Sequence, residues 1–293
     1  MKLLIYGAGV IGSLYAVLLS EAGYNTTIYA RGERLASLTE HGLLYSKKNG
    51  TKRANVRIIG KVENDDYYDY IFLPVRENQV HHALRELRGN ISPNIVTMVN
   101  TLEPYSSWEE LCGKGRIIPA FPGAGGSFYR DVLNAALTPW VLQATTFGEI
   151  GGGKTERLMR LANVFKHSKI PYQIVNDMHI WQLCHLAMVV PIADAYYAAK
   201  IPKQAGIEKI VMRRTAKQLK SNFSLLHNAG IKLSPRKMSL FRIVPISILS
   251  VGLRFIFQSQ FGNMFMYQHS MKAPDEMMRL HNEFYEYVLK LNA

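Results

Sequence analysis

A glycine-rich segment close to the N-terminus is the most informative chemical feature of the sequence. Gly7-Ala8-Gly9-Val10-Ile11-Gly12 follows an apolar run at 3–6 and precedes a stretch with helical periodicity at 13–22. In such a segment the first glycine allows a tight turn, the second lets the backbone approach a pyrophosphate, and the third lets helix and strand pack closely. The free N–H groups at the helix start would face the phosphates. The motif in this context predicts dinucleotide binding; the alternative is a strand–helix turn without a ligand.

The end of the next expected strand, at 25–30, indicates which dinucleotide is bound. Arg31 follows this strand directly, and Arg34 comes one helical turn later. An acidic residue here would bond the ribose 2′-hydroxyl of NAD, whereas a guanidinium suits a 2′-phosphate. Glu33 is a competing signal, but it lies past the usual acidic position. We therefore expect NADP, bound as NADPH, rather than NAD.

Two further polar side chains follow expected strands. Arg76 comes after the apolar run at 70–75, and Asn100 closes the run at 94–100. In open α/β sheets ligands bind at the carboxyl ends of the strands. Arg76 could meet a phosphate or a substrate carboxylate, and Asn100 a ribose or a reacting oxygen; ordinary loop polarity is the alternative for both. The segment 121–126 is either a plain tight turn or a loop that approaches the same ligand.

The elements that position these residues alternate between strand and helix up to about residue 175. This pattern predicts an α/β fold with a doubly wound, Rossmann-type sheet. It includes two paired strands at 140–143 and 146–150. Beyond residue 175 the pattern is helical, at 180–199, 207–229, 238–257 and 275–291. We expect an NADP-binding domain at 1–175 and an all-α domain at 176–293 for substrate binding and dimerisation.

The chain resembles the ketopantoate reductase (2-dehydropantoate 2-reductase) family over nearly its full length. The resemblance rests on the segment Gly7–Gly12 and on Arg31, Val75-Arg76 with Gln79, Asn100, and the helix beginning at Trp181. It implies a Rossmann domain joined to a helical domain. It also implies NADPH-dependent reduction of a 2-oxo acid to its 2-hydroxy acid, with the substrate in the cleft between the domains and Arg76 and Asn100 at the cofactor.

The sequence departs from the family pattern in the expected substrate pocket. Aligned on Trp181 and Pro191, Gln182 stands where the resemblance implies a catalytic lysine, and Leu186 and Val190 stand where it implies two asparagines. The resemblance further implies that Glu276 binds substrate hydroxyls. The replacements at Gln182, Leu186 and Val190 indicate a more apolar substrate pocket than the family pattern implies.

The missing lysine leaves the reduced carbonyl without its proton donor, because glutamine can donate a hydrogen bond but cannot release a proton. His185 lies near the same helix face as Gln182 and titrates near neutrality, so it could replace the lysine as the acid. A hydrogen-bonded core histidine is the alternative. His179 is less well placed, and it falls on a different helix face from His185, so we expect no metal site.

Composition limits the other function classes. The chain of 293 residues has a net charge of +13, with a basic group at Lys209, Arg213, Arg214, Lys217 and Lys220 whose helical spacing favours a solvated helix face. No zinc-finger spacing or RNA-binding motif accompanies it, so we expect no nucleic-acid partner. The two cysteines form no CxxC pair, which favours a reducing, cytoplasmic compartment.

The longest apolar run, at 243–253, is too short for a membrane span, which needs about 20 residues. We interpret this run as a buried helix, with an interfacial membrane helix as the alternative.

The sequence thus favours an NADPH-dependent oxidoreductase that acts on a small, 2-oxo acid-like carbonyl substrate and that could form a homodimer. The alternatives are a catalytically inactive NADP-binding sensor or scaffold on the same fold and, more weakly, a basic surface-binding protein.

Overall fold

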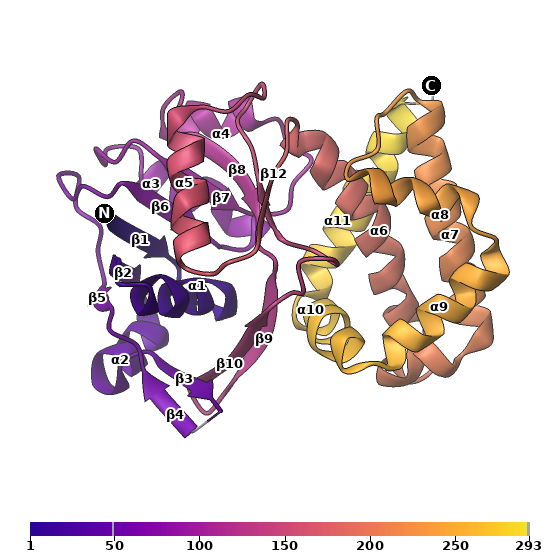
Figure 1. Cartoon of the computed structure of the whole chain (residues 1–293), viewed down its shortest axis with the longest axis horizontal. Coiled ribbons are helices and arrows are strands. Elements are labelled where there is room, and N and C mark those ends of the chain that lie inside the picture. Colours follow the sequence, from indigo (N-terminus) through magenta and orange to yellow (C-terminus); the bar gives the residue numbers. More distant parts are fainter. Residues whose placement is uncertain (49, 292–293) are drawn as a thin grey trace. The chain divides into compact units, whose positions relative to one another are not determined.

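The computed structural model describes residues 1–48 and 50–291, which fall into two compact units. The first unit is Met1–Met178, and the second begins at His179. The first unit combines strands with helices, and the expected alternation is interrupted by two runs of consecutive strands, β3 to β6 and β8 to β11; the regular elements described in the second unit are all helices (Figure 1). The expected fold class, a Rossmann-type sheet followed by a helical part, is confirmed.

An eight-stranded sheet forms the centre of the first unit, in the order β12-β11-β8-β7-β6-β1-β2-β5. Every neighbouring pair is parallel except β8 with β11. The strands are β1 (Lys2–Tyr6), β2 (Asn25–Tyr29), β5 (Arg57–Ile59), β6 (Tyr70–Leu73), β7 (Ile95–Met98), β8 (Ile117–Phe121), β11 (Thr145–Phe147) and β12 (Tyr172–Ile174).

Helices cover both faces of this sheet because its central strands are apolar on both sides. Phe165 of α5 meets Phe72 and Phe147 of the sheet, at ring-centroid distances of 5.9 and 5.3 Å. The side chain of Thr155 caps α5 by accepting a hydrogen bond from the Leu158 N–H. Residues of α1 and α5 share one core with alternate residues of the sheet, and α3 and α4 lie behind the sheet in Figure 1. The helices are α1 (Val10–Glu21), α2 (Gly32–His41), the short 3₁₀ helix η1 (Glu77–Gln79), α3 (Val80–Glu86), α4 (Tyr105–Cys112) and α5 (Glu156–His167).

A second, four-stranded sheet was not predicted from the sequence. Its order is β4-β3-β10-β9, from β3 (Leu44–Lys47), β4 (Gly50–Arg53), β9 (Ala124–Tyr129) and β10 (Val132–Leu137). β9 and β10 form a hairpin around Arg130 and Asp131, which both have positive φ. Positive φ at both residues suits a two-residue β-hairpin turn, but Arg-Asp is not among the residue pairs usually found in such turns. The sequence therefore contained little indication of a hairpin here.

Two predictions made for this region are wrong. Of the two alternatives for the segment 121–126, the plain tight turn is wrong, because β9 begins at Ala124 and a Cβ on Gly126 would lie 2.4 Å from the Ala135 Cα of β10. Residues 140–143 form no strand. Trp140 and Val141 lie in an exposed turn, so their apolar character reflects no buried pairing.

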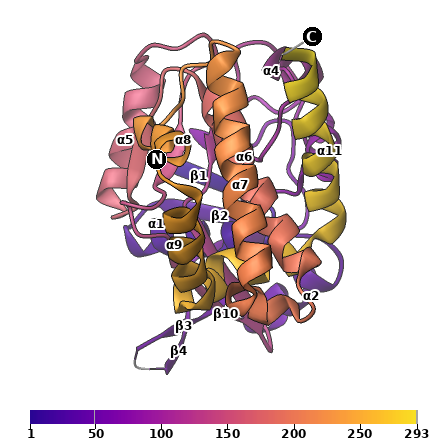
Figure 2. The same ribbon diagram turned by 90° about the vertical axis from the view of Figure 1, so that its right-hand side faces the viewer.

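The helical unit contains α6 (Met178–Ala198), η2 (Pro202–Ile207), α7 (Lys209–Asn228), η3 (Arg236–Ser239), α8 (Leu240–Ile243), α9 (Ile246–Gln258), the π-helical η4 (Gly262–Tyr267), α10 (Gln268–Lys272) and α11 (Pro274–Leu291). In Figure 2, α9 lies beside the lower part of α7, on which it packs.

The single helix predicted at 238–257 is instead three elements. It breaks at Val244, whose extended backbone precedes Pro245. The prediction that the apolar run at 243–253 is a buried helix is also wrong in part, because Ile243, Ile248 and Val251 are exposed.

Candidate functional site

The glycine-rich loop lies at the point where the sheet reverses its strand order. β1 stands between β2 and β6, and the chain leaves the carboxyl ends of β1 and β6 into neighbouring loops. A Cβ on Gly7 would lie 3.5 Å from Val75 Cγ1, and one on Gly12 would lie 3.1 Å from Pro74 Cγ. The two loops therefore touch at the switch point, the usual place for a ligand in an open α/β sheet.

The geometry of the three glycines of the loop is compatible with the three roles expected from their spacing. Gly7 has φ +124°, a conformation that side chains disfavour. A Cβ on Gly12 would lie 2.0 Å from the Gly7 carbonyl oxygen, so only glycine fits there. Gly9 is the N-cap of α1, and nothing lies within 4 Å of the position of its Cβ. The space in front of Gly9 is thus open at the positive end of a helix, as a pyrophosphate requires.

Arg34 is held directly against this loop. Its Nε donates to the Ala8 carbonyl oxygen at 3.2 Å, and its guanidinium lies 4.3 Å from the centre of the Phe128 ring. Its Nη1 pairs with Asp131 at 3.4 Å. Burial lowers the pKa of the Arg34 guanidinium, which Asp131 partly counteracts. The buried Nη2 has no hydrogen-bond partner among the described residues, so a donor remains for a ligand.

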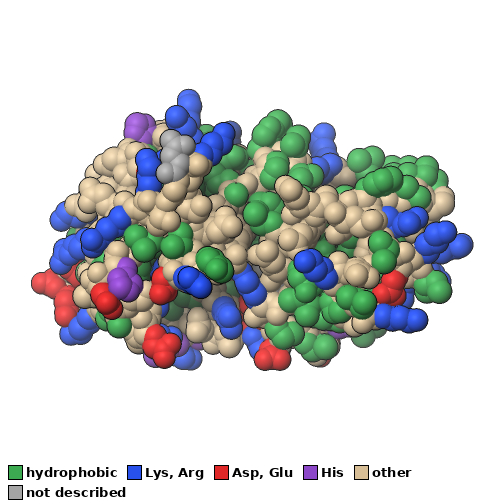
Figure 3. Space-filling model, turned by 90° about the horizontal axis from the view of Figure 1, so that it is seen from below, with side chains coloured by type: hydrophobic (Ala, Val, Ile, Leu, Met, Phe, Trp, Pro, Cys, Tyr) green, Lys and Arg blue, Asp and Glu red, His purple; other side chains and the backbone are tan. Residues whose placement is uncertain are grey.

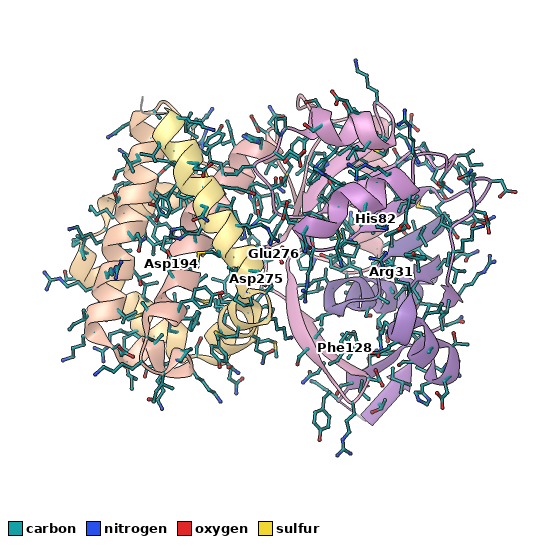
Figure 4. The ribbon with its side chains drawn as sticks, turned by 180° about the vertical axis from the view of Figure 1, so that it is seen from behind. Arg31, His82, Phe128, Asp194, Asp275 and Glu276 are labelled. Carbon is teal, nitrogen blue, oxygen red and sulfur yellow. The ribbon has the colours of Figure 1, made fainter. Side chains whose placement is uncertain are left out.

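Phe128 and Asp131 are site residues that sequence reasoning missed. They belong to the hairpin of β9 and β10, and only the second sheet brings them to Arg34. Arg31 is the exposed N-cap of α2, directly after β2. Figure 4 labels Arg31 and Phe128. Glu33 is exposed in the first turn of α2.

The other predicted strand-end residues lie on the same edge of the sheet. Arg76 is exposed at the start of η1, after β6. Asn100 follows β7, which pairs with β6 in parallel register. The Asn100 Oδ1 is buried and has no hydrogen-bond partner among residues 1–48 and 50–291. An unpaired buried acceptor is costly, and a ligand hydroxyl or amide would satisfy it.

Two tyrosines that the sequence did not single out end β1 and β2. The rings of Tyr6 and Tyr29 lie 4.4 Å apart, and the Tyr6 hydroxyl donates to Glu86 of α3. Burial, then the bond to Glu86, raises the pKa of Tyr6 above its ordinary value, so the phenol stays neutral. His82 of α3 also contacts Glu86, at 3.3 Å. Tyr6 and Tyr29 therefore place an aromatic pair at the ends of β1 and β2, next to the glycine-rich loop.

The predicted residues of the helical unit lie on two helices. Gln182 and His185 are both buried in α6, one turn apart, and the His185 ring stacks on Trp181 at 5.1 Å with an interplanar angle of 8°. Leu186 and Val190 are buried on the same helix. Glu276 lies beside Asp275 in the first turn of α11 (Figure 4).

His179 contacts the hydroxyl of Tyr287, on α11, at 3.3 Å. This contact ties the start of α6 to α11 within the helical unit.

A cavity of about 160 Å³ in the helical unit was not predicted. Asp194 of α6 and His281 of α11 line it, with a nitrogen-to-oxygen distance of 3.0 Å, and Arg214, Thr215 and Gln218 of α7 complete its polar lining. Burial raises the pKa of Asp194, although His281 and Arg214 lower it. Asp194 is the one acidic residue within α6, which is the signal that could have drawn attention to it.

Comparisons with known proteins point to one family. Residues 3–126 match the family model of the ketopantoate reductase PanE/ApbA. A 2-dehydropantoate 2-reductase of Mesorhizobium japonicum is 32% identical over 34% of this chain, and one of Pyrococcus abyssi is 25% identical over 62%. These alignments span 32% and 58% of the length of the two relatives.

Solved structures share the fold along the whole chain. D-mandelate dehydrogenase in complex with NADH has a TM-score of 0.68 at 15% identity, covering 99% of this chain and 97% of that one. A PanE/ApbA family ketopantoate reductase from Ralstonia eutropha has a TM-score of 0.66 at 13% identity, covering 100% of both chains. The segment that matches the family model contains the glycine-rich loop and Asn100, so this part of the chain is similar in sequence to the ketopantoate reductase PanE/ApbA family.

Proposed function

We propose that this protein is an NADPH-dependent oxidoreductase that reduces a small, 2-oxo acid-like carbonyl substrate. One observation carries the proposal: an open glycine loop lies at the switch point of the sheet, and two buried polar atoms beside that edge, Arg34 Nη2 and Asn100 Oδ1, lack partners among the described residues. A dinucleotide fits this arrangement, because it brings a pyrophosphate for the loop and polar groups for both atoms. The match of residues 3–126 to the family model of a reductase supports the same interpretation.

Different residues of the first unit would bind different groups of the cofactor. The N–H groups of Val10, Ile11 and Gly12 are at the start of α1 and would receive the pyrophosphate. Arg31 and Arg34 would receive the 2′-phosphate, and this preference for NADP rests on the absence of an acidic residue directly after β2. Arg76 would add a third positive charge at the same edge. When bound, the nicotinamide supplies the hydride.

The residues of the helical unit would act on the substrate. The carbonyl oxygen gains negative charge during reduction and needs a proton, which we assign to the His185 imidazolium. Gln182, one turn away, would donate a hydrogen bond to the same oxygen and hold it in place. The ring stacking on Trp181 restricts the orientation of His185. Glu276 would accept hydrogen bonds from substrate hydroxyl groups, and Asn100 would orient the reacting end of the substrate or cofactor.

Fluorescence titration of the purified chain with NADPH and NADH tests the cofactor, and turnover on a panel of 2-oxo acids and other ketones tests the reaction. We expect tighter binding of NADPH than of NADH and turnover on at least one small carbonyl. Tight NADPH binding without turnover on the panel would support a catalytically inactive sensor instead. Tighter binding of NADH would contradict the role given to Arg31.

A further inference from the structure

Most of the surplus positive charge of the chain lies in one segment of the helical unit. Residues 209–274 contain eleven Lys and Arg residues and not one Asp or Glu, whereas the rest of the chain has 24 basic and 22 acidic residues. The segment begins with α7 and ends just before α11. Because the segment contains no carboxylate, its positive charges can be paired only with acidic residues outside it, as Arg214 is near Asp194. It therefore forms a basic surface that attracts anions.

The same segment exposes an apolar helix face. α9 buries Leu253 and Phe257 toward its own unit, where it packs on α7 and η2. Its outer face presents Ile248, Val251 and Phe255, spaced three and four residues apart, with 61%, 50% and 74% of their surfaces exposed. This spacing places the three side chains on one side of the helix. Exposed apolar side chains that gather in this way mark an interaction surface.

The short helix α8 extends this apolar face. Leu240 and Ile243 are both exposed, and Ile243 lies just before the break at Pro245. The Lys220 ammonium of α7 donates to the Val244 carbonyl oxygen at 3.1 Å, which holds the connection between α8 and α9 against the basic helix. On the right-hand, helical part of Figure 3, hydrophobic and basic side chains are interspersed and acidic ones are sparse. Apolar and basic groups therefore occur together on this part of the molecule.

We propose that α8 and α9 form a docking surface for a membrane rich in anionic lipids. An amphipathic helix with basic neighbours binds in the plane of the lipid headgroups, burying its apolar side while cations meet lipid phosphates. No helix within the described residues is long and apolar enough to cross a bilayer, so the contact is peripheral. A second copy of this chain is a poorer partner, because two acid-free basic segments would repel each other. A nucleic acid would satisfy the charge and leave the apolar side chains in water.

Vesicle flotation of the full chain tests this surface. We expect binding to phosphatidylcholine vesicles that contain phosphatidylserine, weakening as salt is raised, and little binding to phosphatidylcholine alone. The double variant Ile248→Ser/Phe255→Ser should bind at least about tenfold more weakly, because two membrane-buried side chains are lost. The matched control is Leu289→Ser on α11, a side chain that is 71% exposed and lies outside the segment. This control should bind as the unmodified chain does.

Phe255→Trp provides a second readout that does not depend on a destabilising change. Its emission should shift to shorter wavelength on vesicle addition, relative to the unmodified chain, and the emission of Leu289→Trp should not. Equal binding of the double variant, or no preference for the anionic vesicles, would overturn the proposal. So would a dimer in light scattering that the double variant dissociates without vesicle binding, which would make this face a self-association surface. Binding to duplex DNA that equals vesicle binding and ignores the double variant would overturn it in favour of nucleic acid.

Discussion

Replacing Gly9 by alanine separates the role of the loop in ligand binding from its role in folding. Nothing lies within 4 Å of the new Cβ, and Gly9 has φ −70° and ψ −175°, which alanine adopts readily. Alanine at an N-cap position is mildly unfavourable, whereas loss of glycine freedom in the unfolded chain is favourable. We therefore expect the free energy of unfolding to change by less than about 1 kcal/mol.

The same methyl group would occupy the space that the pyrophosphate needs. Moving a phosphate away from the helix N-terminus removes at least one charge-assisted hydrogen bond, worth about 1.5–3 kcal/mol. The dissociation constant for NADPH should rise roughly 10- to 150-fold. Gly12→Ala is the contrasting variant, because its Cβ would lie 2.0 Å from the Gly7 carbonyl oxygen. Overpacking of this kind costs about 1–3 kcal/mol, so this variant should lose stability as well as affinity.

The assay is a fluorescence titration with NADPH beside urea unfolding of the ligand-free protein, for the unmodified chain and both variants. The expected pattern is a loss of affinity alone for Gly9→Ala and a loss of both properties for Gly12→Ala. If Gly9→Ala binds NADPH as tightly as the unmodified chain, the pyrophosphate does not lie at this loop and the reasoning is refuted. A large loss of stability in Gly9→Ala would refute the claim that the space is open.

Four further outcomes follow from the site and the fold. Arg31→Ala should weaken NADPH binding about tenfold or more and leave NADH binding unchanged in parallel titrations. Arg88→Ala, at another exposed arginine, is the control. Equal losses of affinity for both cofactors would show that Arg31 does not contact the 2′-phosphate. His185→Ala should lower kcat about 10²–10⁴-fold with NADPH affinity unchanged, and an unaltered kcat would show that another group supplies the proton. Arg157→Met should destabilise the protein by about 3–5 kcal/mol in urea unfolding, because it leaves the buried Glu149 carboxylate unpaired; a change below about 1 kcal/mol would mean that the pair is solvated. Burial raises the pKa of Glu149, but the bonds from Arg157 and Thr155 outweigh burial and hold this pKa below its ordinary value. The stability that the carboxylate contributes is therefore present above the pKa of the unfolded state and should be lost as the pH falls through the pKa of the folded state. Urea midpoints measured from pH 7 to about pH 3 should show this loss in the unmodified chain and not in Arg157→Met.

Local patterns in the sequence were enough to locate the glycine-rich loop and the division into an α/β part and a helical part. Strand, glycine turn, helix and strand follow one another within thirty residues, and each is specified by its own periodicity and by its glycines. The three roles of Gly7, Gly9 and Gly12 follow from this spacing, and their geometry agrees with them. The positions of Arg31, Arg76 and Asn100 at strand ends also followed from the chain alone, because parallel strands end on the same edge of a sheet.

Tertiary structure decided what depends on pairing between distant residues or on which helix face is covered. Arg34 meets Phe128 and Asp131 only because β9 and β10 form a second sheet, whose hairpin lies almost a hundred residues farther along the chain. The apolar run at 243–253 predicts a helix but not its orientation, because periodicity does not say which neighbours cover which side. The sequence therefore determined the position and conformation of the glycine loop, whereas packing in three dimensions decided the environment of Arg34 and left Ile248 and Phe255 facing solvent.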